Sequence, residues 1–296
     1  MTPAPQSTLR IFRDVPPEYP SPDSGLEEVA CVPPAHIDPH LLAARELLRP
    51  PAVRACSRGL EPFSRSWFEE LEIKRYGPHG GWVRRVLEFT RHSNESLLML
   101  NPGIGSDALQ YQRHNTQVTV CVTPSDHPEI IRRNFDLRGL SLRLVHTTHD
   151  AGLPFDRGTF DLAYLNLLYT PPANLASQVA ELYRILKPGG KIFVLAPARF
   201  DAGFWQHLVL PFRRWYRPPV HFTDAPRYSA RGLRRVLAPF AEHRTAKRHL
   251  RRSELPHLWR FAPVSVLERF MGRVLILRAF KPVTAALEHL TIDSAA

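Results

Sequence analysis

The stretch "SLLMLNPGIGSDALQYQRHNTQVTVCVTPSD", residues 96–126, decides the fold. It opens with an apolar run, turns at a Gly-x-Gly sequence, continues as a helix-like segment and ends in a second apolar run rich in β-branched residues. A buried strand that leads through glycines into a helix is typical of the first half of a βαβ unit. Gly103 and Gly105 allow a sharp turn that brings backbone N–H groups and the helix N-terminus close to a ligand.

The alternation of strands and helices continues along the chain. A helix predicted over 171–190 places Leu175, Val179 and Leu182 on one face, and Pro188 with the two following glycines ends it. Such alternation favours a parallel sheet covered on both faces. We predict an α/β fold, a Rossmann-like, doubly wound, mostly parallel seven-stranded sheet with an antiparallel final strand. The expected strands are 96–100, 117–122, 140–146, 160–168, 191–196, 241–250 and 273–282.

Charge is distributed unevenly along the 296 residues. Residues 1–200 hold 22 Lys and Arg against 21 Asp and Glu, whereas residues 201–296 hold 17 against 7, so most of the formal charge of +11 lies in the last third. The three cysteines form no CxxC pair, and neither a signal peptide nor an apolar run of about 18 residues is visible. We expect a cytoplasmic protein without a metal site, with peripheral membrane contact as a second localisation.

The chain divides into parts of different composition. Residues 1–60 read as a Pro-rich extension that contains one short helix over 38–48, with Asp38 as N-cap. Residues 61–282 are predicted to form the main domain, in which residues 202–262 make a basic C-terminal cap, and residues 283–296 form a tail. Two amphipathic helices, in 64–77 and 80–92, are expected before the first strand.

Three further motifs indicate similarity to a known family. "LPF" at 153–155, "FD" at 160–161 and "RILKPGG" at 184–190 follow the glycine turn in order. With these motifs the chain resembles the class I S-adenosylmethionine (SAM)-dependent methyltransferases of the Methyltransferase-11 type over roughly residues 65–282. The resemblance implies the Rossmann-like fold and SAM as cofactor.

The ligand-facing positions depart from the family pattern. Where relatives carry an acidic residue at the end of strand one, this chain has Met99, and Asn101 replaces the first glycine of the turn. The acid that accepts hydrogen bonds from the ribose in relatives aligns with Val122, with Cys121 and Thr123 as alternatives. Loss of such a charge-assisted bond costs roughly 1.5–3 kcal/mol.

The resemblance also implies which residues line the site. Asn101 and Thr123 could each accept one hydrogen bond, and Asp150 could accept one from the adenine amino group or simply form a turn. Asn166 is expected at the acceptor side of the crevice or as a strand-end cap, and Asp107 as a helix cap. The candidate cofactor-binding residues are Asn101, Gly103, Gly105, Val122, Thr123, Asp150, Ala151 and Asn166.

Two functions follow from this pattern. One is SAM-dependent methyl transfer to a small-molecule or lipophilic acceptor, with no general base assigned. The other is a catalytically inactive, methyltransferase-like scaffold or regulatory protein, which the missing carboxylates favour. The aromatic, basic segment 202–227 is either a solvated face or a surface that contacts anionic lipid, and arginines 213, 214 and 217 would carry that contact. Nucleic acid ranks third, because no RNA-binding module is recognisable.

Overall fold

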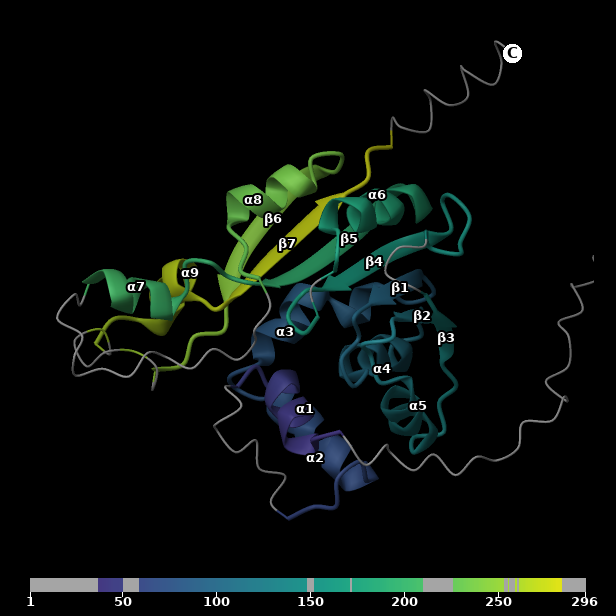
Figure 1. Cartoon of the computed structure of the whole chain (residues 1–296), viewed down its shortest axis with the longest axis horizontal. Coiled ribbons are helices and arrows are strands. Elements are labelled where there is room, and N and C mark those ends of the chain that lie inside the picture. The colour runs from purple at the N-terminus through teal and green to yellow at the C-terminus, as the bar shows by residue number, and fades with distance from the viewer. Residues whose placement is uncertain are drawn as a thin grey trace, which may run out of the picture. The chain divides into compact units, whose positions relative to one another are not determined.

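The strands form one sheet with the predicted topology. In the computed structural model, the described part of the chain holds a seven-stranded sheet of order β3-β2-β1-β4-β5-β7-β6 (Figure 1). Strands β1 to β5 are parallel, and β7 pairs antiparallel with both β5 and β6. The predicted fold class is therefore confirmed. The strands are β1 (Ser96–Leu100), β2 (Gln117–Val122), β3 (Arg143–His146), β4 (Phe160–Asn166), β5 (Leu186–Pro197), β6 (Ala241–Arg248) and β7 (Val274–Phe280).

The structure describes most, but not all, of the chain. The described residues are 37–49, 59–147, 152–170, 172–209, 226–252, 255, 259 and 261–283, without the side chains of 206–209. Asp150, Ala151 and the basic segment 210–225, with arginines 213, 214 and 217, therefore lie outside the described residues.

Four of the helices begin at a polar side-chain cap. Asp38, Ser64, Asn174 and Ser229 each accept a hydrogen bond from a backbone N–H in the first turn of the helix that follows. The helices are α1 (Pro39–Glu46), α2 (Arg65–Arg75), α3 (Gly81–Leu87), α4 (Ser106–Arg113), α5 (Pro128–Asp136), α6 (Leu175–Ile185), α7 (Ala202–Val209), α8 (Ala230–Val236) and α9 (Val264–Met271), with a 3-10 turn η1 (Phe89–Arg91).

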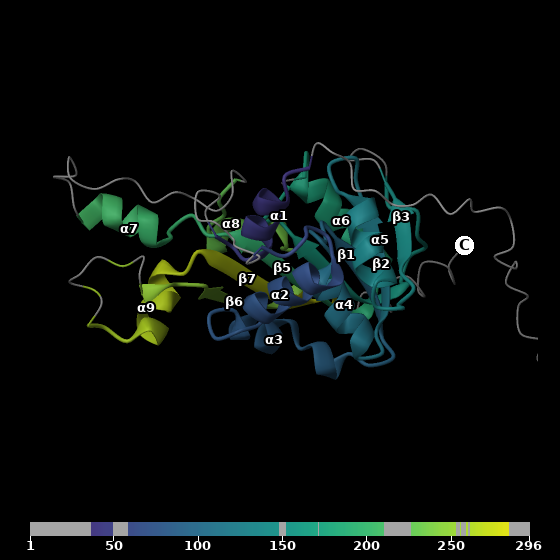
Figure 2. The same ribbon diagram turned by 90° about the horizontal axis from the view of Figure 1, so that it is seen from below.

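Both faces of the sheet are buried, as the continuous apolar strands predict. In β1, Leu97 and Met99 face a cluster formed with α3, η1, α4 and α5, whereas Leu98 and Leu100 face a second cluster formed with α6 and α8. Figure 2 shows α3 and α4 on one side of the sheet and α6 and α8 on the other. Alternate residues of each strand thus serve two separate cores.

The N-terminal helices form a third apolar cluster. Leu42 and Leu47, from α1 and its C-terminal end, pack with Trp67, Phe68 and Leu71 of α2, all of them buried. The cluster also contains Ile104 of the glycine turn and Ile130 of α5. Helix α1 is therefore held beside the loop that follows β1.

One predicted boundary is wrong. The sequence predicts that Pro188, Gly189 and Gly190 end the helix, but α6 already ends at Ile185 and β5 starts at Leu186. The pairing of β4 with β5 shifts in register between Phe160 and Leu162, so the Pro-Gly-Gly segment forms an irregular start of the strand. No helix in the described part of the chain is long and apolar enough to cross a membrane.

Candidate functional site

The glycine turn lies at the carboxyl end of β1, beside the point where the strand order reverses. Strand β1 pairs with β2 on one side and with β4 on the other, and such switch points of α/β sheets form ligand-binding crevices. Asn101, Gly103 and Gly105 have positive φ angles of 54°, 64° and 85°. Asn is the side-chain-bearing residue best suited to this region, so it can replace the first glycine.

The Asn101 side chain closes the turn against the neighbouring strand. Its Nδ2 donates to the carbonyl oxygens of Asn166 at 2.9 Å and Thr170 at 3.0 Å. Asn101 therefore ties the end of β1 to the end of β4 and the loop that follows it. Whether its amide oxygen also binds a ligand stays a prediction.

The third glycine serves helix packing. A Cβ atom at Gly105 would lie 3.1 Å from Ile131 Cγ2 and 3.3 Å from Phe135 Cε2 of α5. Asn134 of the same helix donates its Nδ2 to the Ile104 carbonyl at 2.8 Å. Helix α5 thus holds the turn in place while α4 begins directly after Gly105.

Gly103 faces two side chains from distant parts of the chain. A Cβ atom at this position would lie 2.8 Å from Tyr169 Cε2 and 3.1 Å from Glu46 Oε2. Tyr169 follows β4, and Glu46 is the last residue of α1. Because Gly103 has no side chain, the Tyr169 ring and the Glu46 carboxylate can lie against its Cα atom.

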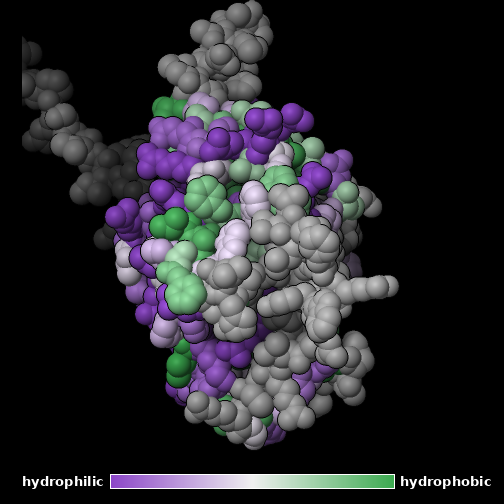
Figure 3. All heavy atoms as spheres, turned by 90° about the vertical axis from the view of Figure 1, so that its left-hand side faces the viewer, coloured by the Kyte–Doolittle hydropathy of each residue, from purple (hydrophilic) through white to green (hydrophobic). Residues whose placement is uncertain are grey.

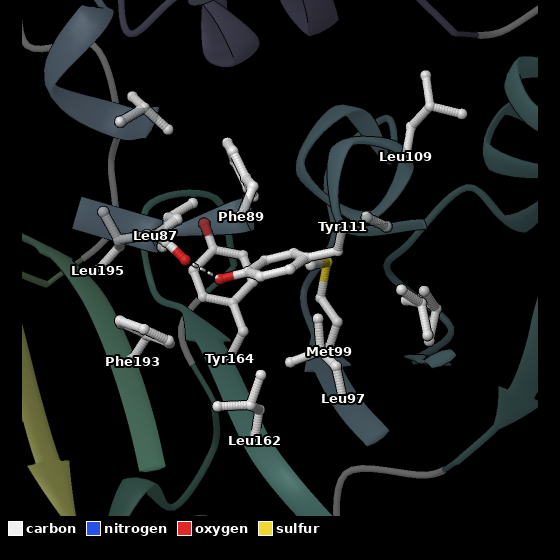
Figure 4. Close-up of a cluster of buried hydrophobic side chains, with 14 of the residues drawn as sticks. Leu87, Phe89, Leu97, Met99, Leu109, Tyr111, Leu162, Tyr164, Phe193 and Leu195 are labelled. Carbon is white, nitrogen blue, oxygen red and sulfur yellow. Dashed lines mark hydrogen bonds between the residues drawn. The ribbon is translucent and has the colours of Figure 1, made fainter. Parts of the chain in front are cut away.

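Met99 is a core residue. It is fully buried and belongs to the same cluster as Tyr111 and Tyr164 (Figure 4). Tyr111 donates its hydroxyl to the Leu87 carbonyl at 2.6 Å in this cluster. An acidic side chain at position 99 would enter apolar surroundings, so the replacement of the acid by Met fits the packing found here.

A carboxylate is instead present on α4. Asp107 is 3% exposed and accepts hydrogen bonds from Arg75 Nε at 3.0 Å, Arg75 Nη2 at 2.6 Å, Tyr76 Oη at 2.8 Å and Tyr164 Oη at 2.9 Å. Burial, and then the Asp107 charge, raise the pKa of both phenols well above the usual value. The sequence suggested a helix cap at Asp107, but Gly105 is the N-cap, with no side-chain cap bond. Asp107 is the acceptor of a buried ion pair.

At the end of β2, a carboxylate comes from a residue that the sequence analysis passed over. Val122 is 1% exposed and Cys121 is fully buried, with burial raising the pKa of its thiol to about 12. Asp126 Oδ2 accepts from Thr123 N and Thr123 Oγ1, both at 2.8 Å. The turn "TPSD" thus places the Asp126 carboxylate at the carboxyl end of β2, four residues after the position where relatives carry theirs.

Asn166 is more enclosed than expected. It is 1% exposed, and its Oδ1 accepts a hydrogen bond from Leu168 N at 3.0 Å. These contacts cap the end of β4. Of the remaining candidates, Asp150 and Ala151 lie outside the described residues, so their contribution stays a prediction.

A separate surface cleft lies at the other end of α4. It has a volume of about 660 Å³ and is lined by residues that include Arg84, Arg85, Phe89 and His114. His114 follows the last residue of α4, whereas the glycine turn precedes the first. The cleft is therefore distinct from the crevice at the carboxyl ends of the strands. Within the described ranges, no group of three His, Cys, Asp or Glu residues could hold a metal ion.

Comparison with known proteins agrees with this geometry. A family model described as a methyltransferase domain matches residues 98–190, from β1 to the start of β5. Demethylmenaquinone methyltransferase of Thermus thermophilus is 30% identical over 123 residues, which are 40% of this chain and 56% of that protein. Sterol 4-C-methyltransferase of Caenorhabditis elegans is 34% identical over 104 residues, 34% of this chain and 30% of that protein.

Over residues 98–190 the chain is similar to methyltransferase domains. It spans about half of the first relative and under a third of the second. The crystal structure of geranyl diphosphate C-methyltransferase from Streptomyces coelicolor shares the fold, with a TM-score of 0.50 and 16% identity over 75% of this chain and 86% of that one.

Three residues of this methyltransferase-like site escaped the sequence analysis. Asp126 could have been found as an acid in a Ser- and Pro-containing turn directly after a strand. Glu46 and Arg75 leave no such signal, because each looks like an ordinary charged residue of an amphipathic helix. Only the packing of α1 and α2 against the glycine turn brings them to the crevice.

Proposed function

We propose that this chain binds SAM at the glycine turn and transfers its methyl group to a small, lipophilic acceptor. The observation that carries the proposal is the turn itself. Gly103 and Gly105 adopt left-handed conformations at the carboxyl end of β1, and α4 begins there with backbone N–H groups directed toward the crevice. When bound, SAM would supply a methyl group on a positively charged sulfur; the acceptor would bond to the methyl carbon as its bond to sulfur breaks, and S-adenosylhomocysteine would leave.

The residues present fit the two ends of this cofactor differently. Asp126, with Thr123, supplies the oxygen acceptors that a ribose diol requires, in place of the family's acid at position 122. At the other end, Glu46 and Tyr169 lie against Gly103. A ligand at Gly103 therefore requires a local rearrangement. The role of this chain is to position donor and acceptor and to exclude water.

The binding half of the proposal is tested by calorimetric titration with SAM and with S-adenosylhomocysteine. We expect micromolar affinity for the wild type and a ten- to hundred-fold loss, on the order of one charge-assisted hydrogen bond, for Asp126→Asn. Asp156→Asn removes an exposed carboxylate from the loop before β4 and is the matched control, with unchanged affinity.

The same titration tests the alternative. If the protein binds neither compound at millimolar concentration, a catalytically inactive, methyltransferase-like scaffold or regulatory protein is favoured. The enclosed Val122 and Met99 and the covered Gly103 support this alternative. Methyl transfer from SAM to any acceptor would contradict it.

The acceptor class is proposed from the relatives. The two curated relatives are named for methyl transfer to demethylmenaquinone and to a sterol, both apolar compounds. Incubation with methyl-labelled SAM and a total lipid extract is expected to place the label in the organic phase. Label found only in the aqueous small-molecule fraction would contradict a lipophilic acceptor.

An apolar patch supports contact with a membrane surface. Phe261, Val266 and Phe270 are 91%, 51% and 60% exposed, and Phe200 is 36% exposed. Figure 3 views the side of the molecule that carries α7 and α9, where apolar side chains are mixed with hydrophilic ones. Lys247 lies within 5.8 Å of the Phe200 ring centroid, and Arg269 is exposed on α9. We propose that this patch contacts anionic lipid.

Vesicle sedimentation tests the membrane contact. The wild type is expected to bind vesicles that contain phosphatidylglycerol more strongly than vesicles of phosphatidylcholine alone, and Phe261→Ser with Phe270→Ser should weaken this binding about ten-fold or more. Ile73→Ser, which removes an exposed apolar side chain on α2, is the control. Equal binding by all three proteins, or no binding at low salt, would remove the proposal.

A further inference from the structure

Glu46 is a buried carboxylate placed over the glycine turn. It is 2% exposed, and its Oε1 lies 3.3 Å from Arg75 Nε, while Tyr169 donates its hydroxyl to Oε2 at 3.3 Å. Oε2 also lies 3.1 Å from the position of a Cβ atom at Gly103. The carboxylate therefore occupies the space that the glycine leaves open.

The Glu46 carboxylate makes longer hydrogen bonds than the carboxylate of Asp107. Arg75 binds Asp107 through two bonds of 2.6 and 3.0 Å, whereas the contacts of the Glu46 carboxylate with Arg75 and with Tyr169 each measure 3.3 Å. Burial raises the pKa of Glu46, and the charge of Arg75 only partly offsets this effect. A buried carboxylate with long hydrogen bonds is destabilising, and costs of this kind are concentrated at functional sites.

The hydrogen-bond donors around Glu46 could also bind the carboxylate of a ligand. Ser106, the first residue of α4, is 1% exposed, and its Oγ makes no hydrogen bond of normal geometry, although it lies near enough to lower the pKa of Glu46. The N-terminus of α4 has no side-chain cap. Arg75, Tyr169, Ser106 and the end of α4 thus form one site with donors directed at a negative charge.

We propose that the Glu46 carboxylate is an internal competitor of the cofactor, which occupies the subsite for the cofactor's own carboxylate. The inference rests on the proposed function. SAM and S-adenosylhomocysteine end in an amino acid, so each brings a carboxylate that can take the place of Glu46 against Tyr169 and Arg75. The end of α1 stays in place, because Arg75 Nη1 donates to the Glu46 carbonyl at 2.5 Å and the His249 ring bonds the Leu48 carbonyl at 3.1 Å.

This arrangement makes binding depend on the exchange of one carboxylate for another. The apparent affinity of a ligand is reduced by the fraction of protein in which its site is occupied by a competitor. Removal of the Glu46 carboxylate should therefore strengthen the binding of ligands that carry the amino-acid end. Ligands without that end should not be affected.

Calorimetric titration of two ligands separates these effects. We expect Glu46→Ala to bind S-adenosylhomocysteine about ten-fold more tightly than the wild type. The affinity for 5′-methylthioadenosine, which lacks the amino-acid end, should be the same in both proteins. Glu69→Ala, which removes an exposed carboxylate from α2, is the matched control and should change neither affinity.

A second variant covers the case in which Glu46→Ala fails to fold. Glu46→Gln keeps the size of the side chain and removes its charge, so it should also strengthen S-adenosylhomocysteine binding, by a smaller factor. In the better folded of the two variants, Tyr169→Phe should weaken S-adenosylhomocysteine and leave 5′-methylthioadenosine unchanged.

The outcomes distinguish this inference from the proposed function. If wild type and variants bind S-adenosylhomocysteine equally, or the variants bind it less well, the proposed function stands and internal competition is overturned. An equal gain for both ligands would also overturn it, because the effect would not concern the amino-acid end. If no protein binds either ligand, the proposed function and the inference both fail.

Discussion

Asp107 joins three elements of the fold through its two carboxylate oxygens. Its partners come from the end of α2, from Tyr76 directly after it and from the middle of β4. All of these groups are buried, so the charges of Arg75 and Asp107 depend on each other for compensation. The pKa of Arg75 is raised well above its usual value by the carboxylates of Asp107 and Glu46, which outweigh its burial.

Removal of this charge is expected to be strongly destabilising. Asp107→Asn leaves Arg75 buried with only the weakly held Glu46 carboxylate, so the free energy of unfolding should fall by about 3 kcal/mol or more. Tyr164→Phe removes one of the four hydrogen bonds and should lower it by about 1.5 kcal/mol. Urea unfolding followed by circular dichroism measures both changes.

An exposed acid provides the comparison. Asp136→Asn, at the exposed end of α5, should change the free energy of unfolding by less than about 0.5 kcal/mol. Equal stabilities of Asp107→Asn and Asp136→Asn would show that the buried ion pair contributes nothing net to folding.

The packing of α5 against the glycine turn is the main constraint among the elements around the crevice. Gly105 and Gly139 both have positive φ, at 85° and 65°, but their surroundings differ. A Cβ atom at Gly105 would come within 3.3 Å of two side chains of α5, whereas at Gly139 nothing lies within 4 Å. The two positions therefore separate backbone strain from helix packing.

Alanine substitutions should reveal this difference. Gly139→Ala introduces only the strain of a left-handed conformation, roughly 1 kcal/mol, and Gly105→Ala adds a steric conflict with α5 for a total of about 2–3 kcal/mol. Thermal unfolding of both variants measures the difference. A loss of stability at Gly139 as large as that at Gly105 would mean that strain alone accounts for both.

His249 connects the region after β6 to the region after α1. It follows β6, and its ring Nε2 bonds the Leu48 carbonyl after α1, 201 residues away. Burial, followed by the nearby charges of Arg251 and Arg273, lowers the pKa of His249 to about 3. The imidazole is neutral in the folded protein, so its Nε2 carries the proton that it donates to Leu48.

This pKa predicts acid sensitivity of the whole fold. Because the folded value of about 3 lies below the ordinary 6.5, the unfolded chain binds the extra proton as the pH falls. Stability is full above pH 6.5 and should decrease below it by up to about 1.4 kcal/mol for each pH unit. His249→Gln, which keeps a donor for Leu48, should unfold with a smaller dependence on pH between 6 and 4.

The control for this experiment is His114→Gln, which replaces an exposed histidine after α4. Its stability should follow the wild-type pH curve. If His249→Gln follows that curve as well, the buried imidazole is not the group that binds the proton on unfolding.

Local patterns determined the fold. Apolar runs placed most strands of the sheet, although β6 is largely polar, and Asp38, Ser64, Asn174 and Ser229 have the cap chemistry that starts a helix. The Gly-x-Gly turn and "RILKPGG" were enough to indicate the family. These features depend on residues within a few positions of each other, so the sequence contains them directly. The Ile185 helix end was missed because the choice between helix and strand there depends on pairing with β4.

The polar groups of the crevice were decided by tertiary structure. Glu46 meets Tyr169 across 123 positions, and Arg75 meets Asp107 across 32. Amphipathic helices show which residues are apolar, but the charged residues that become buried are selected by how α1 and α2 pack on the turn. Met99 and Val122 face a packed core, and the carboxylates beside the crevice come from α1, α4 and the turn after β2.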